Sequence, residues 1–303
     1  MRSLAAAGWA AAVLATGAQS ALGQDEAATA PPPVEGREPT WTLGSGRTLN
    51  LFPASDVYPV YIADPHKTEN AALALVFTRP RIPDSSAQRF ALKAGGRLGV
   101  LRLDPGEAHA RSWQLSIDAG LDFQADSQRK QDAIGWDGSY GLTLTTASRG
   151  PYSFKLAHIH SSGHVGDEYA ERTGRQRIDY TRQELGLGAA RRIGRGGRAY
   201  AELGWGYGLL TEEQETWRLQ VGFEYESRRG LVGGRFAWYA AVDLQAMEER
   251  DWRLDVAVQA GILTRAGGRR FRLGVQYDDG RATMTEFFQT TEAWFSFGLW
   301  VEL

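Results

Sequence analysis

From residue 71 onward, hydrophobic and polar side chains alternate almost without interruption. In residues 113–123, for example, Trp, Leu, Ile and Phe stand at odd positions, whereas Gln, Ser and Asp stand between them. Successive side chains of a β-strand point to opposite faces, so this alternation predicts strands with one apolar and one polar face. About twelve such strands fit the chain, beginning near residues 71, 90, 112, 133, 152, 178, 198, 216, 235, 251, 270 and 294.

The length and composition of these strands favour a membrane barrel over a soluble sandwich. Each runs for about ten residues or more, the length that a tilted strand needs to cross a membrane. Trp or Tyr recurs near the ends of the apolar faces, as aromatic girdles require, and charges of both signs on the other face suit a polar interior. The pattern therefore predicts an all-β fold, an antiparallel transmembrane β-barrel of about twelve strands in the outer membrane of a Gram-negative bacterium.

The connections between the strands predict which end of the barrel faces the periplasm. Short connections rich in Gly are typical of periplasmic turns. They fall at residues 148–151, 193–197, 227–234 and 265–268. Longer connections, which we expect outside the cell, fall at residues 80–89, 163–177 and 278–291.

The residues before the barrel divide into three segments. Residues 1–23 have a basic start, an apolar alanine-rich run and small residues near the end, which predicts a cleaved signal peptide and export. Residues 24–40 contain consecutive prolines and no periodicity, which predicts a disordered linker. Residues 41–70 contain further prolines among hydrophobic side chains, which predicts an N-terminal periplasmic segment or a plug. The barrel itself is predicted over residues 71–303.

The composition restricts the function further. The 303 residues carry a formal net charge of −2, so we expect no nucleic-acid partner, and the absence of cysteine excludes disulfide and thiol chemistry. The polar strand face combines acidic and basic side chains, which we expect to pair across a narrow interior and fill much of it, leaving no selective pore. They are Asp118, Asp122, Asp137, Glu202, Arg218, Glu224, Asp243, Arg253, Asp255, Arg270, Arg272 and Glu302.

One predicted strand changes character along its length. Residues 152–169 read YSFKLAHIHSSGHVGDEY, in which Tyr152, Phe154 and Leu156 share one face. On that same face they are followed by His158, His160, Ser162 and His164. Because this strand is expected to run outward from the periplasmic side, the polar group is predicted on the lipid-facing surface near the outer leaflet.

His160 and Ser162 have the residue types of an acyl-transfer pair. Side chains two apart on a strand lie ~6.6 Å apart along it, which lets an imidazole reach a hydroxyl. A histidine base and a serine nucleophile need a third group that orients the histidine. The returning strand carries Asp179, Thr181 and Gln183 toward the same outer face, and Asp179 is the predicted orienting group.

The neighbouring residues leave other interpretations open. Asp167 and Glu168, in the intervening loop, could replace Asp179 as the orienting group or attract Ca²⁺. His158 and His164, together with these two carboxylates, form a weaker candidate for a transition-metal site. A further interpretation is that the polar residues only meet lipid head groups at the membrane interface.

Three stretches resemble a known family. HSSGHVGDEY, the following RIDY and the upstream LFPASDVYPVYIADPHK resemble an uncharacterised family of bacterial outer-membrane proteins, domain of unknown function 1207, over roughly residue 51 to the C-terminus. That resemblance implies a barrel and no particular activity. Separately, residues 160–162 look like the His-x-Ser of outer-membrane phospholipase A and the lipid A deacylase barrels, whose triads lie on the lipid-facing surface. By that likeness His160 would be the base, Ser162 the nucleophile and Asp179 the orienting group.

Together these features predict an outer-membrane barrel whose first candidate activity is lipid-ester hydrolysis, by serine chemistry that requires no cofactor, with Ca²⁺ as an optional ligand. The expected partners are outer-membrane lipid or lipopolysaccharide. The alternating C-terminal strand, which ends FSFGLWVEL, adds the barrel-assembly machinery as an expected partner. The alternative is a non-enzymatic barrel, a narrow channel or a scaffold, in which the His and Ser residues are only interfacial.

Overall fold

The computed structural model describes residues 39–106, 111–148, 150–228, 230–266 and 269–302. The predicted signal peptide, residues 1–23, and residues 24–38 of the predicted linker lie outside the described residues. In the part of the chain that the structure describes, no helix is long and apolar enough to span a membrane.

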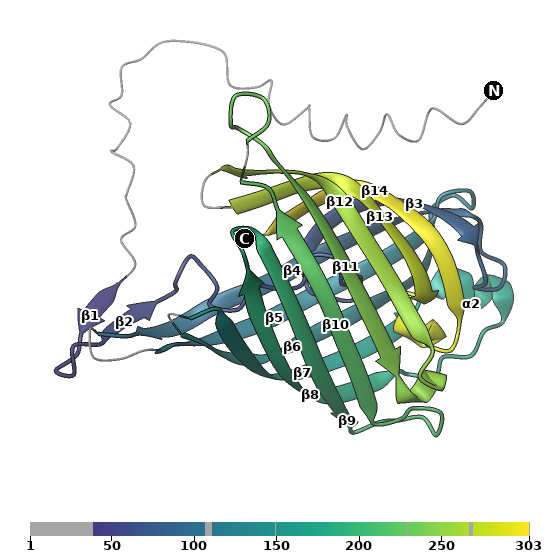
Figure 1. Ribbon diagram of the computed structural model, residues 1–303. Coiled ribbons are helices and arrows are strands. Elements are labelled where there is room, and N and C mark those ends of the chain that lie inside the picture. The colour runs from purple at the N-terminus through teal and green to yellow at the C-terminus, as the bar shows by residue number, and fades with distance from the viewer. Residues whose placement is uncertain (1–38, 107–110, 149, 229, 267–268, 303) are drawn as a thin grey trace, which may run out of the picture. The chain divides into compact units, whose positions relative to one another are not determined.

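Twelve antiparallel strands form a closed barrel (Figure 1). Each pairs with its neighbours in chain order, and β14 pairs back onto β3. The strands are β3 (Asn70–Arg79), β4 (Gln88–Asp104), β5 (Arg111–Asp126), β6 (Asp132–Ser148), β7 (Tyr152–Val165), β8 (Thr181–Ile193), β9 (Gly197–Tyr207), β10 (Trp217–Glu226), β11 (Ala237–Met247), β12 (Leu254–Ala266), β13 (Arg269–Arg281) and β14 (Thr291–Glu302). The predicted transmembrane-type barrel of about twelve strands is confirmed.

The predicted strand starts lie within three residues of the observed ones. Two of the larger offsets have a local cause. Asp179 and Asp251 adopt left-handed backbone conformations, with φ of 52° and 53°, just before β8 and β12. A strand cannot contain that conformation, so the chain turns there and the strand begins two or three residues later.

The alternation along each strand separates an apolar outer wall from a polar interior. On β10, Leu219, Val221 and Phe223 are 41–47% exposed, whereas Gln220 and Glu224, on the other face of the strand, are 2% and 5% exposed. A soluble protein would bury the first set and expose the second. The inverted distribution is that of a wall in contact with lipid.

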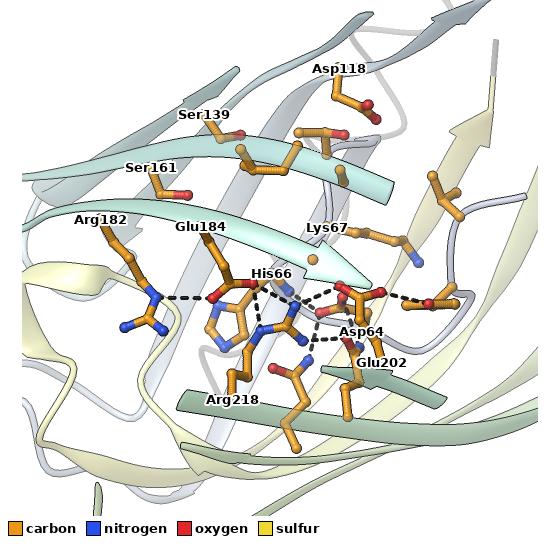
Figure 2. Close-up of a pocket in the computed structure, with 18 of the residues that line it drawn as sticks. Asp64, His66, Lys67, Asp118, Ser139, Ser161, Arg182, Glu184, Glu202 and Arg218 are labelled. Atoms are coloured by element: carbon orange, nitrogen blue, oxygen red, sulfur yellow. Dashed lines mark hydrogen bonds and ion pairs between the residues drawn. The ribbon is translucent and has the colours of Figure 1, made fainter. Parts of the chain in front are cut away.

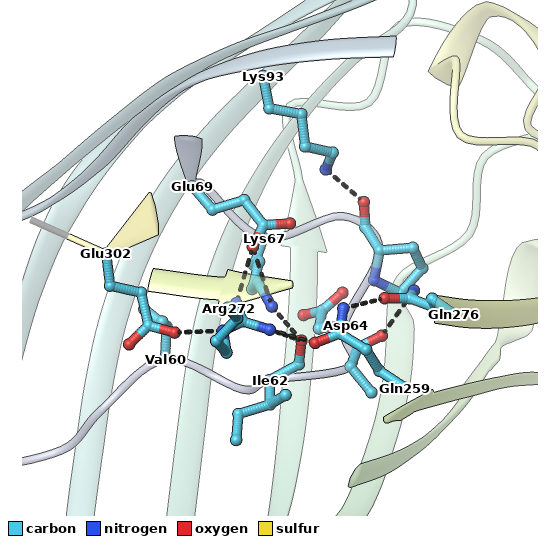
Figure 3. A network of polar contacts seen from close by, with 12 residues as sticks. Val60, Ile62, Asp64, Lys67, Glu69, Lys93, Gln259, Arg272, Gln276 and Glu302 are labelled. Atoms are coloured by element: carbon cyan, nitrogen blue, oxygen red, sulfur yellow. Dashed lines mark hydrogen bonds and ion pairs between the residues drawn. The ribbon is translucent and has the colours of Figure 1, made fainter. Parts of the chain in front are cut away.

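The N-terminal residues form a hairpin and a segment inside the barrel. β1 (Thr40–Thr42) pairs with β2 (Thr48–Leu51), and β2 pairs with the end of β4. Residues 56–69, which we call the luminal segment, then lie within the ring of strands (Figure 3). Its backbone carbonyls accept hydrogen bonds from inward-facing side chains: Tyr58 from Arg97 at 2.9 Å, Pro59 from Arg198 at 2.6 Å, Ala63 from Gln276 at 3.1 Å and Pro65 from Lys93 at 2.6 Å. These bonds satisfy carbonyls that burial removes from water.

Ion pairs occupy much of the remaining interior. Arg218 lies 2.7 Å from Glu184 and 2.6 Å from Glu202, and Arg97 lies 2.8 Å from Asp118. One of the charges predicted to face inward does not do so. Arg253 is exposed, because it belongs to the turn before β12 and not to the strand.

The two ends of the barrel differ in their connections. The end that carries β1 and β2 has short turns, such as residues 194–196, and we call it the inner end. The outer end carries longer loops with α2 (Asp167–Thr173), η1 (Glu248–Arg250) and η2 (Thr285–Phe287). A buried cluster that includes Ile134, Tyr169 and Phe287 packs the loops of α2 and η2 together. Burial raises the pKa of the Tyr169 phenol, which donates a hydrogen bond to the Pro83 carbonyl at 2.6 Å.

Candidate functional site

Strand β7 carries the predicted cluster, and its even-numbered side chains face outward. Tyr152, Phe154 and Leu156 are 40–48% exposed on the lipid-facing wall. The odd-numbered Ile159 and Ser161 line an internal cavity of about 200 Å³ (Figure 2). The even-numbered His158, His160, Ser162 and His164 therefore lie on the outer wall, toward the outer end of the strand.

His160 is held between the two neighbouring strands. Its direct partner on β6 is Tyr140, whose ring centroid lies 4.7 Å from that of the imidazole at an interplanar angle of 31°. Its direct partner on β8 is Gln183, whose side-chain amide nitrogen lies 2.5 Å from Nδ1. Ring contact on one side and an amide on the other restrict the orientation of the imidazole.

Ser162 lies two residues further along the same face. Its neighbours across the sheet are Gly138 on β6 and Thr181 on β8. Gly138 has no side chain, and a Cβ added there would lie 3.6 Å from the Ser162 hydroxyl oxygen. The glycine therefore leaves the space of one side chain free beside the serine hydroxyl.

Asp179, the predicted orienting group, lies apart from this pair. It is exposed in the loop before β8, in the left-handed conformation described above. Among the described residues, no hydrogen bond or ion pair joins its carboxylate to His160 or Ser162. The side chain that reaches the imidazole is Gln183, which sequence reasoning placed on the correct face but did not select. The register of the two strands would have identified it, because Gln183 is the direct partner of His160 in the β7–β8 pairing.

The candidate metal ligands are not brought together. His158 and His164 are six residues apart on one strand, which separates them by roughly 20 Å. His164 stacks on Trp136 with ring centroids 4.0 Å apart, and His158 faces Tyr207 at 6.0 Å.

Two further candidate ligands, Asp167 and Glu168, lie in the first turn of α2, where Asp167 pairs with Arg177. Within the described ranges, no group of three or more His, Cys, Asp or Glu side chains could hold a metal ion. Ca²⁺ usually takes six to eight oxygen ligands, and the residues expected to attract it do not form such a set.

The inner side of the same strands has a different character. Figure 2 shows Ser139 and Ser161 on the wall of the cavity, with the ion-paired Arg182 and Glu184 on the neighbouring strand β8 and Arg218 beyond them. Ser161 and Ser162 are thus adjacent in the sequence and face opposite sides of the barrel wall.

The fold resembles those of solved outer-membrane enzymes. Outer membrane phospholipase A from Escherichia coli matches with a TM-score of 0.53 at 9% identity, over 78% of this chain and 93% of that chain. An active-site mutant of the same protein, in which an asparagine is replaced by alanine, gives 0.54 at 10% identity, over 82% and 93%. The Salmonella typhi outer membrane phospholipase dimer with bound calcium gives 0.53 at 10% identity, over 82% and 95%. This likeness shows the fold, that of a Gram-negative outer-membrane β-barrel.

Sequence comparison identifies the family without an activity. No curated protein matches this chain. The family model described as protein of unknown function (DUF1207) matches residues 19–302. The chain therefore belongs to the DUF1207 family of proteins of unknown function.

Proposed function

We propose that this barrel hydrolyses acyl ester bonds of outer-leaflet lipids, with Ser162 as the nucleophile and His160 as the base. The observation that carries the proposal is the contact between the His160 imidazole and the Gln183 amide, on an outer wall that also carries Ser162. A histidine oriented by a polar group, beside an accessible hydroxyl, has the elements that acyl transfer needs.

In the proposed reaction, Gln183 selects the tautomer of the histidine. In the structure the amide nitrogen meets Nδ1, and the proposed reaction uses the amide turned over, with its oxygen at that position. Nδ1–H then donates to the amide oxygen of Gln183, and Nε2 keeps its lone pair. Nε2 takes the proton from Ser162 as the hydroxyl oxygen attacks the ester carbonyl, and the alcohol leaves with that proton. A water molecule, deprotonated by the same nitrogen, then hydrolyses the acyl-enzyme. Asp179 has no part in this proton transfer.

The wall around the site suits a lipid substrate. Between His160 and the inner end of the barrel, the outer faces of β6, β7 and β8 form a continuous apolar surface. Its side chains are 38–59% exposed: Leu142, Leu144, Leu156, Leu185 and Leu187. An acyl chain lying along this surface would bring its ester group to the height of Ser162, where Gly138 leaves room. The substrate class we propose is therefore a phospholipid or lipopolysaccharide acyl ester. The proposed reaction does not use Ca²⁺. For the C-terminal strand, the proposed partner is the barrel-assembly machinery.

The structural neighbours support the assignment of Gln183. The E. coli phospholipase A shares the barrel fold, and its active-site mutant replaces an asparagine. Gln183 carries the same carboxamide group as asparagine, on a side chain one carbon longer. Either carboxamide can accept a hydrogen bond from an imidazole N–H.

A non-enzymatic barrel is the second candidate, and the ring contacts favour it. His164 and His158 each face an outward aromatic side chain, Trp136 and Tyr207 respectively. The histidines would then extend the aromatic girdle with groups that bind head-group phosphates and water. Under this alternative Ser162 performs no chemistry.

The experiment that tests the proposal compares two adjacent serines. The purified full chain is mixed with detergent-dispersed phosphatidylethanolamine or lipopolysaccharide, and released fatty acid is measured by mass spectrometry. We expect hydrolysis by the wild-type chain, loss of it to background in Ser162→Ala, and its retention in Ser161→Ala. The proposal would be contradicted if the wild type released fatty acid from neither of the two lipids. It would also be contradicted if both variants lost hydrolysis equally.

A further inference from the structure

The inner end of the barrel carries exposed arginines that neither the interior nor the proposed site uses. Three of them, Arg111, Arg191 and Arg269, lie at strand ends in register with the outward-facing residues of β5, β8 and β13. Five more exposed arginines are found in or beside the inner turns: Arg192, Arg195, Arg228, Arg235 and Arg265. We call this set the inner arginine collar.

The described carboxylates at this end do not neutralise the collar. The side chains of Asp104, Glu226 and Glu302 are 31%, 28% and 20% exposed. Asp104 pairs with Arg102, and Glu302 pairs with two inward-facing arginines. Glu226 alone reaches a member of the collar, Arg265, at 2.8 Å. Between described residues, no ion pair involves any of the three strand-end arginines.

Two arginines of the collar lie directly on lipid-facing rings. The guanidinium carbon of Arg191 lies 5.6 Å from the ring centroid of Tyr152, its direct partner on β7. The guanidinium carbon of Arg111 lies 5.7 Å from the ring centroid of Phe154. Both rings belong to the wall that contacts lipid. These guanidinium groups are therefore at the border between the apolar wall and the polar region, where head groups lie.

The outer end has the opposite balance. Among the described residues of its loops, nine exposed carboxylates face six exposed basic side chains. The excess of arginine is thus specific to the inner end and does not reflect the composition of the chain, whose formal net charge is −2.

We propose that the inner arginine collar binds the phosphate groups of anionic phospholipids in the leaflet around the inner end of the barrel. Guanidinium groups form paired, charge-assisted hydrogen bonds with phosphate oxygens, and unpaired arginines at head-group depth provide the donors for them. Binding at several points around the rim would fix the depth of the barrel in the membrane. The proposal does not depend on any catalytic role of Ser162.

The test compares inner and outer charge removal in the full chain. One variant combines Arg111→Gln, Arg191→Gln and Arg269→Gln. The matched control combines Arg81→Gln, Lys130→Gln and Arg253→Gln, which removes three exposed positive charges from the outer end. Folding of each variant is checked by the mobility shift of the barrel on gels before and after heating.

Binding of phosphatidylglycerol to each protein in dodecyl maltoside micelles is measured by native mass spectrometry. Each arginine near the membrane surface should contribute about fivefold to lipid affinity, so the inner variant, which lacks three, should bind about a hundredfold more weakly. The outer variant should bind like the wild type. Millimolar inorganic phosphate should not displace the lipid. Wild-type binding by the inner variant, an equal loss in both variants, or displacement of the lipid by free phosphate would each overturn the proposal.

Discussion

Polar side chains in the interior of the barrel have close hydrogen-bond and ion-pair partners, whereas those on the outer wall at β7 have few. Inside, Arg272 is fully buried and contacts Glu69 at 3.2 Å and Glu302 at 2.9 Å (Figure 3). On the wall, Ser162 and the carboxylate of Asp179 form no hydrogen bond between described side chains, and His160 meets one amide. A buried charge without a partner costs several kcal/mol, whereas a half-exposed hydroxyl costs little. The interior polar groups therefore hold the structure, and those on the wall are available for chemistry.

The largest effect should follow from opening the interior network. Replacing Arg272 with methionine keeps the volume but removes one partner from the buried Glu69 and one from Glu302, which lies nearer the inner end. We expect the free energy of unfolding to fall by about 3–5 kcal/mol, as when one member of a buried ion pair is removed. The measurement is the denaturant dependence of tryptophan fluorescence for the barrel refolded into phospholipid vesicles.

Arg265→Met is the control for this change. The Arg265 side chain is 62% exposed and pairs with Glu226 at the inner rim. Its replacement should therefore lower the free energy of unfolding by less than about 1 kcal/mol. Planar-bilayer recordings add an independent reading of the same network. The wild-type barrel should conduct no steady current, because the luminal segment and its ion pairs occupy the interior. Equal stability of the two variants, or a steady wild-type conductance, would show that the interior network does not close the barrel.

A smaller effect is expected on the wall, where one amide orients the base. Gln183→Leu removes the group that meets Nδ1 of His160 and should lower the rate of lipid hydrolysis about a hundredfold, with little change in KM. Gln183→Asn should restore part of the rate. Gln183→Glu should move the acidic limb of the rate–pH profile to higher pH, because a carboxylate stabilises the protonated, non-basic imidazole. Unchanged rates and pH profiles across these variants would remove Gln183 from the site.

The contrast between the two regions also explains what the sequence could predict. Alternation along the chain is a local property, so it predicted the strands, their number and the outward direction of His160 and Ser162. The partner of His160 depends on the register between β7 and β8, which follows a loop of 15 residues whose length does not set the pairing. The left-handed turn at Asp179 shifts the start of β8, so that Gln183 and not Asp179 faces the imidazole.

The interior was harder to predict, for a related reason. The charges that face inward could be recognised from their alternation with apolar residues, but their partners could not. Arg272 meets Glu69 across 203 residues of chain, and only closure of the ring by β14 and β3 brings them together. The luminal segment carries prolines and hydrophobic side chains that fit either a periplasmic position or a plug. Its position follows from carbonyl hydrogen bonds to arginines and a lysine on distant strands.

The smallest expected effect is on stability at the proposed nucleophile. Ser162→Ala deletes a hydroxyl that forms no hydrogen bond with another described side chain and sits opposite a glycine. The free energy of unfolding should therefore change by no more than about 0.5 kcal/mol, measured in the same vesicle assay. The control is Thr143→Ala, which deletes a buried hydroxyl that donates to Asp118 at 2.5 Å and should cost about 1.5–3 kcal/mol. If Ser162→Ala lowered the free energy of unfolding as much as Thr143→Ala, the serine would be a structural element of the wall. The distinction between a structural interior and a chemically available wall would then fail at its most important residue.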